Sequence, residues 1–314
     1  MRIAVIGAGS MGGVFGGRLT AAGNDVWLVD VWQAHVDAMN RDGLRLEAPD
    51  GSRVIPVRAT SDVAKVGVAD LVIVFVKSYD TPAAARSALP LVGENTVLLT
   101  MQNGLGNRDA IAAVVGEERV VSGVSYVGAA LAGPGHVRQT SSNVSLLGEM
   151  DAGPTPRVQR IAGLLEEAGF PVRLTDNLRG EIWGKLLVNC VGNASCALTG
   201  LTGLGLIQFP SGREWVRLVA EETAAVAQAL GIRLPYPDAT EKMFQNCEVA
   251  GPAKPSMLQD VEHGRWTEID YINGAVVREG GRAGVPTPYN RALTLLVRML
   301  ESRQHGLEPD RPPL

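Results

Sequence analysis

The stretch RIAVIGAGSMG, residues 2–12, decides the fold of the first half of this 314-residue chain. It begins with a short apolar run typical of a buried strand, and glycines follow in the spacing G-x-G-x-x-G. Where a helix comes next, such a loop lets the backbone approach a pyrophosphate, which rests on the helix N-terminus. The other reading is a plain strand-to-helix turn. We predict a dinucleotide-binding loop formed by Gly7, Ala8, Gly9, Ser10, Met11 and Gly12.

Strand-like and helix-like segments alternate after this loop. A helix is expected at 10–22, a strand at 25–30, and an unbroken apolar strand at 71–76. Further strands are expected at 96–100, 120–124, 137–147 and 171–174, with an antiparallel pair at 44–46 and 54–57 and a helix at 155–168. Apolar strands and a β-α-β rhythm are typical of a parallel, doubly wound sheet covered on both faces. We therefore predict an α/β fold with a Rossmann dinucleotide-binding domain at residues 1–178.

Helical patterns dominate the rest of the chain. They are expected at 181–198, 213–230, 256–264, 268–280 and 289–303, before a loose tail at 308–313. We predict an all-α C-terminal domain at residues 179–314.

Composition narrows the function. Lys plus Arg is 29 and Asp plus Glu is 33, so the net charge of −4 argues against a nucleic-acid partner. The uncharged stretch 186–212 is long enough to cross a membrane, but its asparagines, proline and glycines favour a buried helix and a loop. Three cysteines without a C-x-x-C pair fit a reduced, cytoplasmic setting. Four scattered histidines predict no metal site.

Asp30 closes the second predicted strand, 18 residues after Gly12. An acid at about this distance accepts the ribose hydroxyls of NAD and repels the additional phosphate of NADP. Alternatively, Asp30 is a turn residue before Val31. Arg41 and Arg45 lie nearby without a motif to place them. The cofactor is therefore expected to be NAD(H) or NADP(H), with Asp30 favouring NAD(H).

Two loops leave the carboxyl ends of later strands, where ligands bind in such folds. One loop is 76–78, where Lys77 is expected to contact the adenosine half of the cofactor. The other loop is 102–106, where Asn103 is expected beside the nicotinamide and the substrate. The alternatives are a solvated lysine and an ordinary Asn-Gly turn.

A polar stripe marks the helix expected at 181–198. Lys185, Asn189 and Asn193 follow at i, i+4 and i+8, so they share one face over about 12 Å at about 1.5 Å per residue. Asparagine is a poor residue for a helix interior, so two at this spacing need a reason. The stripe favours binding of a polar ligand; a structural hydrogen-bond network is the alternative.

Two further segments carry candidate residues. Ser256 and Gln259 fit the capping box S-x-x-Q, which makes Ser256 an N-cap, and a helix N-terminus also attracts carboxylates. Glu268 and Asp270 either favour a helix start or include an acid that faces Lys185.

Together these features resemble the ketopantoate reductase family. The shared features are the glycine loop, Lys77, Asn103-Gly104, K-x3-N-x3-N at 185–193, SMLQD at 256–260 and TEIDYING at 267–274. The resemblance spans nearly the whole chain and implies reduction of 2-dehydropantoate, a small 2-oxoacid, to (R)-pantoate in pantothenate biosynthesis. It implies that Lys185 donates the proton and that Asn189, Asn193 and Ser256 hold the substrate.

The resemblance also implies roles for the remaining candidates. Glu268 would contact the substrate hydroxyl or the cofactor ribose, Asn103 would support Lys185, and Ala129 would contact the cofactor. A homodimer formed through the helical domain follows by analogy alone. The chemistry fits: hydride attack on a ketone builds negative charge on oxygen, which a nearby ammonium stabilises and protonates. Burial lowers the pKa of such a lysine and an acid raises it.

Two departures from the family pattern leave alternatives open. Asp30 stands where reference members carry a basic residue, and Gly203 stands where some carry a substrate-contacting asparagine. An NAD-dependent dehydrogenase for D-2-hydroxyacids such as D-mandelate is therefore the nearest alternative. A non-enzymatic nucleotide sensor is a second one, although a sensor needs no proton donor.

Overall fold

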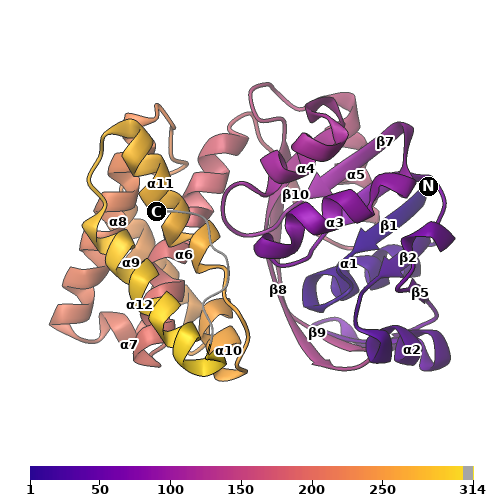
Figure 1. Ribbon diagram of the computed structural model, residues 1–314, viewed down its shortest axis with the longest axis horizontal. Helices are drawn as coiled ribbons and strands as arrows, with labels where there is room; N and C mark the ends of the chain where they lie inside the picture. The colour runs from indigo at the N-terminus through magenta and orange to yellow at the C-terminus, as the bar shows by residue number, and fades with distance from the viewer. Residues whose placement is uncertain (307–313) are drawn as a thin grey trace. The chain divides into compact units, whose positions relative to one another are not determined.

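The computed structural model describes residues 1–306 and Leu314, so the tail expected at 308–313 lies outside the described residues. The chain divides into two compact units (Figure 1). The N-terminal unit comprises Met1–Gln102 and Asn107–Leu178, and the helical unit comprises Asn103–Gly106 and Arg179–Leu314. The short segment Asn103–Gly106 therefore interrupts the N-terminal unit in sequence but packs with the helices that follow it.

The N-terminal unit is built on one ten-stranded sheet. Its order is β4-β3-β9-β8-β7-β6-β1-β2-β5, and β10 pairs with β9. The central strands are parallel, whereas β3 with β4 and β8 with β9 are antiparallel. The strands are β1 (Arg2–Ile6), β2 (Asp25–Val29), β3 (Leu44–Ala48), β4 (Gly51–Ile55), β5 (Arg58–Thr60), β6 (Ala69–Val74), β7 (Val92–Thr100), β8 (Val120–Gly133), β9 (His136–Gly148) and β10 (Val172–Leu174). The predicted Rossmann-type architecture is confirmed, including the antiparallel pair near residue 50.

Alternate residues of each central strand enter different apolar cores. Ile3 and Val5 of β1 pack into one core with helices α1 and α5, whereas Ala4 and Ile6 pack into another with α3 and α4. Both faces of the sheet are thus covered, as its unbroken apolar strands require. The helices of this unit are α1 (Ser10–Ala21), α2 (Gln33–Asp42), α3 (Thr81–Ser87), α4 (Asn107–Val115) and α5 (Pro156–Glu167).

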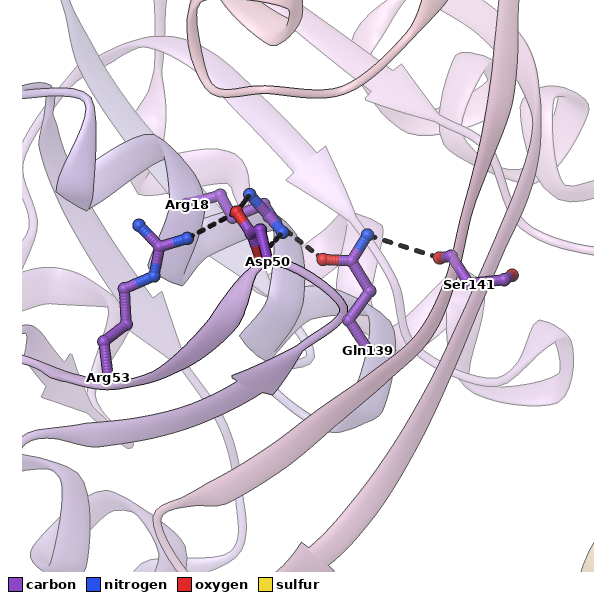
Figure 2. A network of polar contacts seen from close by, with 5 residues as sticks. All are labelled: Arg18, Asp50, Arg53, Gln139 and Ser141. Carbon is purple, nitrogen blue, oxygen red and sulfur yellow. Dashed lines mark hydrogen bonds and ion pairs between the residues drawn. The ribbon is translucent and has the colours of Figure 1, made fainter.

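A buried arginine fixes helix α1 to the sheet (Figure 2). The guanidinium of Arg18 binds both carboxylate oxygens of Asp50, at 3.1 and 2.8 Å, and donates to Oε1 of Gln139 at 2.6 Å. Gln139 in turn donates to the carbonyl oxygen of Ser141 at 3.2 Å, and Arg53 adds a second cation at Asp50. The network joins α1 to the β3–β4 turn through Asp50 and to β9 through Gln139, so the helix behind the glycine loop is held at two places.

The helical unit contains seven α-helices among its described residues: α6 (Leu178–Thr199), α7 (Gly203–Ile207), α8 (Pro210–Ala229), α9 (Ala239–Ala250), α10 (Ser256–Glu262), α11 (Asn273–Ala283) and α12 (Pro288–His305). Helix α9 was not among the predicted helices, although Asp238 caps its first turn by accepting from the N–H of Glu241 at 2.9 Å. Within residues 1–306, no helix has both the length and the hydropathy needed to span a membrane.

The helix expected at 268–280 is not continuous. A short 3-10 turn, η5 (Ile269–Tyr271), is separated from α11 by Ile272, whose φ of −105° and ψ of −93° are not helical. The carbonyl oxygen of Tyr271 accepts from the N–H of Leu105 at 2.8 Å, a partner from a distant part of the chain. This carbonyl joins two segments instead of extending a helix, so the prediction of one helix there was wrong.

Candidate functional site

The glycine loop joins β1 to α1, and its three motif glycines have different surroundings. Gly7 has a φ of +87°, and a Cβ on it would lie 2.8 Å from the N of Val76. A Cβ on Gly12 would collide with the carbonyl oxygen of Gly7, whereas one on Gly9 would meet no atom within 4 Å. Packing thus requires glycine at two of these positions, and the third leaves open space beside the backbone.

The first turn of α1 is suited to an anion. Its N-cap is Gly9, which offers no side-chain cap, and the turn carries no acidic residue. The first N–H groups of a helix have no partner within the helix, and the helix dipole favours negative charge there. Open space at Gly9 and these N–H groups fit the pyrophosphate of a dinucleotide, the group that the sequence motif implies.

Three predicted cofactor contacts lie at one edge of the sheet. β1 is hydrogen-bonded between β2 and β6, and these three parallel strands end beside one another. Gly7 donates to the carbonyl oxygen of Val29, and Phe75 donates to that of Ile6, each at 2.8 Å. Asp30 follows β2 and Lys77 follows β6, so both leave the same edge as the glycine loop. After β1 the chain enters α1 on one face of the sheet, and after β6 it enters α3 on the other face. The ends of β1 and β6 therefore form a topological switch point, where such folds bind ligands.

Asp30 also makes the local bond of a turn residue. Its Oδ1 accepts from the N–H of Trp32 at 2.9 Å. Both readings of Asp30 are therefore compatible with the structure, since the carboxylate has a second oxygen. Ala129 lies in the β8–β9 ribbon opposite Gln139, whose side chain accepts from Arg18 of α1.

In the helical unit, helix α6 presents the polar stripe expected from the sequence. Lys185 and Asn189 are half-buried, and Asn193 is buried. Burial lowers the pKa of Lys185 from its ordinary value of 10.5 to about 8, and the negative charge of Glu268 acts in the opposite direction. Of the two candidate acids, Glu268 and Asp270, Glu268 is the one that raises the pKa of Lys185. Asp270 instead forms an ion pair with Arg298, with Nη2 and Oδ1 2.6 Å apart.

The amide nitrogen of Asn189 is the most informative atom of the stripe. It is buried, and among the described residues it has no hydrogen-bond partner. An unpaired buried N–H group costs free energy, so such groups are rare in folded proteins. A polar ligand would satisfy this N–H group, so the unpaired nitrogen favours the ligand-binding interpretation over a purely structural network.

Ser256 approaches the stripe from α10. It is the first residue of that helix, Pro255 occupies the N-cap position, and there is no side-chain cap. The capping prediction for Ser256 was therefore wrong. Gln259 donates to the carbonyl oxygen of Lys254 instead of completing a capping box, and the Ser256 hydroxyl lies 3.5 Å from Oδ1 of Asn193.

Asn103 belongs to the helical unit, and the turn that follows it packs on the η5 segment of that unit. Gly104 has a φ of +81°, and a Cβ on it would collide with the carbonyl oxygen of Tyr271. Together with the bond from Leu105, this close approach holds Asn103–Gly106 on the η5 segment, whose N-cap is Glu268. Six candidates from four stretches of sequence thus belong to one compact unit: Asn103, Lys185, Asn189, Asn193, Ser256 and Glu268.

Comparison with known proteins covers both units. Residues 3–152 match the family pattern described as ketopantoate reductase PanE/ApbA, and residues 177–301 match its C-terminal pattern. The 2-dehydropantoate 2-reductase of Streptococcus pyogenes serotype M1 is 33% identical over 304 residues, covering 96% of this chain and 98% of that protein.

Two solved structures have closely similar folds. A PanE/ApbA family ketopantoate reductase from Ralstonia eutropha JMP134 has a TM-score of 0.91 and 37% identity, covering 97% of this chain and 100% of its own. A D-mandelate dehydrogenase with NADH and anilino(oxo)acetate has a TM-score of 0.90 and 31% identity, with the same coverage. On these matches, the chain belongs to the ketopantoate reductase family.

Proposed function

We propose that this protein is an NAD(P)H-dependent oxidoreductase that reduces 2-dehydropantoate to (R)-pantoate, a step of pantothenate biosynthesis. The observation that carries the proposal is the placement of Lys185. Its half-buried ammonium has a pKa of about 8, and it shares one face of its helix with the amides of Asn189 and Asn193. A group with this pKa is protonated at neutral pH and still gives up its proton readily. Family membership supports the class of reaction, and the position of Lys185 supports its assignment as the proton donor.

We assign dinucleotide binding to the N-terminal unit. The glycine loop and the uncapped start of α1 would hold the pyrophosphate, Asp30 the ribose hydroxyls and Lys77 the adenosine half. The contact assigned to Ala129 rests on family resemblance alone. When bound, the reduced nicotinamide supplies the hydride.

We assign substrate binding to the helical unit, which includes Asn103. As the ketone carbon gains a hydride, its oxygen gains negative charge, and Lys185 donates the proton that turns this oxygen into the hydroxyl of the product. Glu268 keeps Lys185 charged until that step. The free N–H of Asn189, the amide of Asn193 and the hydroxyl of Ser256 would bind the polar groups of the 2-oxoacid.

The cofactor preference follows from Asp30. A carboxylate at the end of β2 accepts the ribose hydroxyls of NADH and repels the 2′-phosphate of NADPH. We propose that NADH is preferred. The oxygen of Asp30 that does not accept from Trp32 is the one assigned to the ribose.

A D-2-hydroxyacid dehydrogenase is the second candidate. The similar structure of D-mandelate dehydrogenase contains NADH, and Gly203 here begins helix α7 without a side chain to contact a substrate. A nucleotide sensor is disfavoured, since it would not need a lysine with a lowered pKa beside an unpaired amide.

The test is turnover of reduced nicotinamide, followed by its absorbance, with two 2-oxoacids and with NADH and NADPH in parallel. Faster turnover with 2-dehydropantoate supports the proposed reaction. Faster turnover with the 2-oxoacid of D-mandelate selects the second candidate. Binding of NADH without turnover of either acid would contradict both assignments.

A further inference from the structure

His35 is a fully buried histidine of helix α2 whose two ring nitrogens are both engaged. The backbone N–H of Gly135 donates to Nδ1 at 2.9 Å. Because Nδ1 accepts, the ring proton lies on Nε2, which is 3.0 Å from the carbonyl oxygen of Ala8 and donates to it. The contacts therefore define one neutral tautomer of His35.

The acceptor of this bond lies inside the glycine loop. The carbonyl of Ala8 and the N–H of Gly9 belong to one planar trans peptide unit, so they point in opposite directions. A donor that holds the Ala8 oxygen thereby sets the direction of the Gly9 N–H at the N-cap of α1. Gly9 is also the motif glycine with open space beside it.

The same imidazole contacts the Asp30 segment. Its ring stacks on that of Trp32, with centroids 5.4 Å apart and an interplanar angle of 7°. The N–H of Trp32 donates to Asp30, and the carbonyl oxygen of Trp32 accepts from the N–H of His35 at 2.9 Å. One side chain thus contacts both the loop assigned to the pyrophosphate and the turn that carries the acid assigned to the ribose.

We propose that His35 is a positioning residue for the dinucleotide, which holds the Ala8–Gly9 peptide and the Asp30 turn in the arrangement that binds it. The inference rests on the proposed function, since it concerns the same cofactor. His35 acts through the backbone and touches no reacting atom. Its donor nitrogen, rather than its volume, is the group that matters for cofactor affinity.

Two substitutions separate the two nitrogens of the ring. A glutamine amide reaches the position of Nε2 and can donate to Ala8, whereas an asparagine amide reaches only that of Nδ1 and can accept from Gly135. We expect His35→Gln to bind NADH within about threefold of the wild-type affinity and His35→Asn to bind it about tenfold more weakly, the loss expected for one unmade buried bond. At saturating NADH, kcat should be unchanged in both.

Val158→Ala is the matched control for stability. Val158 is fully buried in α5. It belongs to the apolar core that also contains residues of β1 and α1, and it is not part of the glycine loop. It should lower the melting temperature without changing the dissociation constant of NADH, measured by the fluorescence of the bound cofactor. If His35→Asn does not fold, His35→Met replaces it as an apolar variant without a donor.

Equal NADH affinity in the donor and non-donor variants would overturn the role of His35. The role of His35 would also be overturned if both His35 variants lost NADH affinity and Val158→Ala, with the same melting temperature as those variants, lost as much. Failure of the wild-type protein to bind either NADH or NADPH would instead overturn the proposed function, and with it this inference.

Discussion

Lys185 and Glu268 are linked by charge: burial lowers the pKa of the Lys185 ammonium to about 8, and the carboxylate of Glu268 keeps it from falling further. The two residues come from segments 83 positions apart and belong to the same compact unit. Lys185 therefore keeps its positive charge at neutral pH and still releases its proton more easily than an ordinary lysine.

Removal of the ammonium should abolish proton donation without affecting the cofactor. We expect Lys185→Met to lower kcat for reduction by about 10²–10⁴-fold, the usual contribution of general acid catalysis. The dissociation constant of NADH, measured by fluorescence titration, should change little, since the glycine loop lies in the other unit. Turnover at the wild-type rate would remove Lys185 from the mechanism.

The rate of reduction should depend on pH through Lys185. Only the protonated lysine donates, so kcat should be level below pH of about 8 and fall above it. In Glu268→Gln the effect that raises the pKa is lost, and the fall should begin at a lower pH. Asp270→Asn is the control, because Asp270 pairs with Arg298 and should leave the profile in place. A Glu268→Gln profile identical to the wild type would contradict the linkage.

Lys185 should lower the stability of the protein at neutral pH. In the unfolded chain Lys185 has its ordinary pKa of 10.5, so between pH of about 8 and 10.5 the unfolded state binds more protons than the folded state. The free energy of unfolding therefore rises with pH between about 8 and 10.5. Below pH of about 8, burial of the charged Lys185 lowers the free energy of unfolding by its full amount. We expect Lys185→Met to melt about 2–4 °C above the wild type at pH 7. The difference should shrink at pH 10; an increase there would show that the sign is wrong.

Asn189 should be needed for the substrate and not for folding. Its buried Nδ2 has no partner in the described part of the chain, so Asn189→Leu removes an unpaired polar group and should leave the melting temperature equal or higher. The KM for the 2-oxoacid should rise by about tenfold, the value of one hydrogen bond.

Asn290→Leu provides the contrast. Asn290 is buried and fully paired, donating to Glu222 at 2.8 Å and accepting from Asn273 at 2.9 Å. Its replacement should lower the melting temperature. A fall in stability for Asn189→Leu as large as that for Asn290→Leu would assign Asn189 to the core instead of the site.

Asp30 should set the choice of cofactor. In Asp30→Ser the hydroxyl can still accept from the N–H of Trp32, but the negative charge is absent. We expect kcat/KM for NADPH relative to NADH to rise about tenfold or more, as repulsion of the 2′-phosphate is relieved. Asp62→Ser is the control, since Asp62 accepts from Ala64 in a similar turn at 3.0 Å. An unchanged ratio in Asp30→Ser would leave Asp30 as a turn residue alone.

Local pattern was sufficient for much of the fold. The spacing of three glycines after an apolar strand predicted β1, its loop and α1, and the four-residue spacing of Lys185, Asn189 and Asn193 predicted their common helix face. These features depend on residues within one or two turns of each other. Helical periodicity and the steric freedom of glycine act over that range, so the sequence contains them directly.

The tertiary structure decided what distant segments do to one another. The bond from Leu105 to Tyr271 lies at the break in the helix predicted at 268–280, and the approach of Asn193 to Ser256 joined residues 63 positions apart. His35, one of four scattered histidines in the sequence, became a buried donor to the glycine loop. Each outcome depends on contacts whose partners are set only when the chain has folded, because a buried polar group takes whichever partner the packing brings within reach.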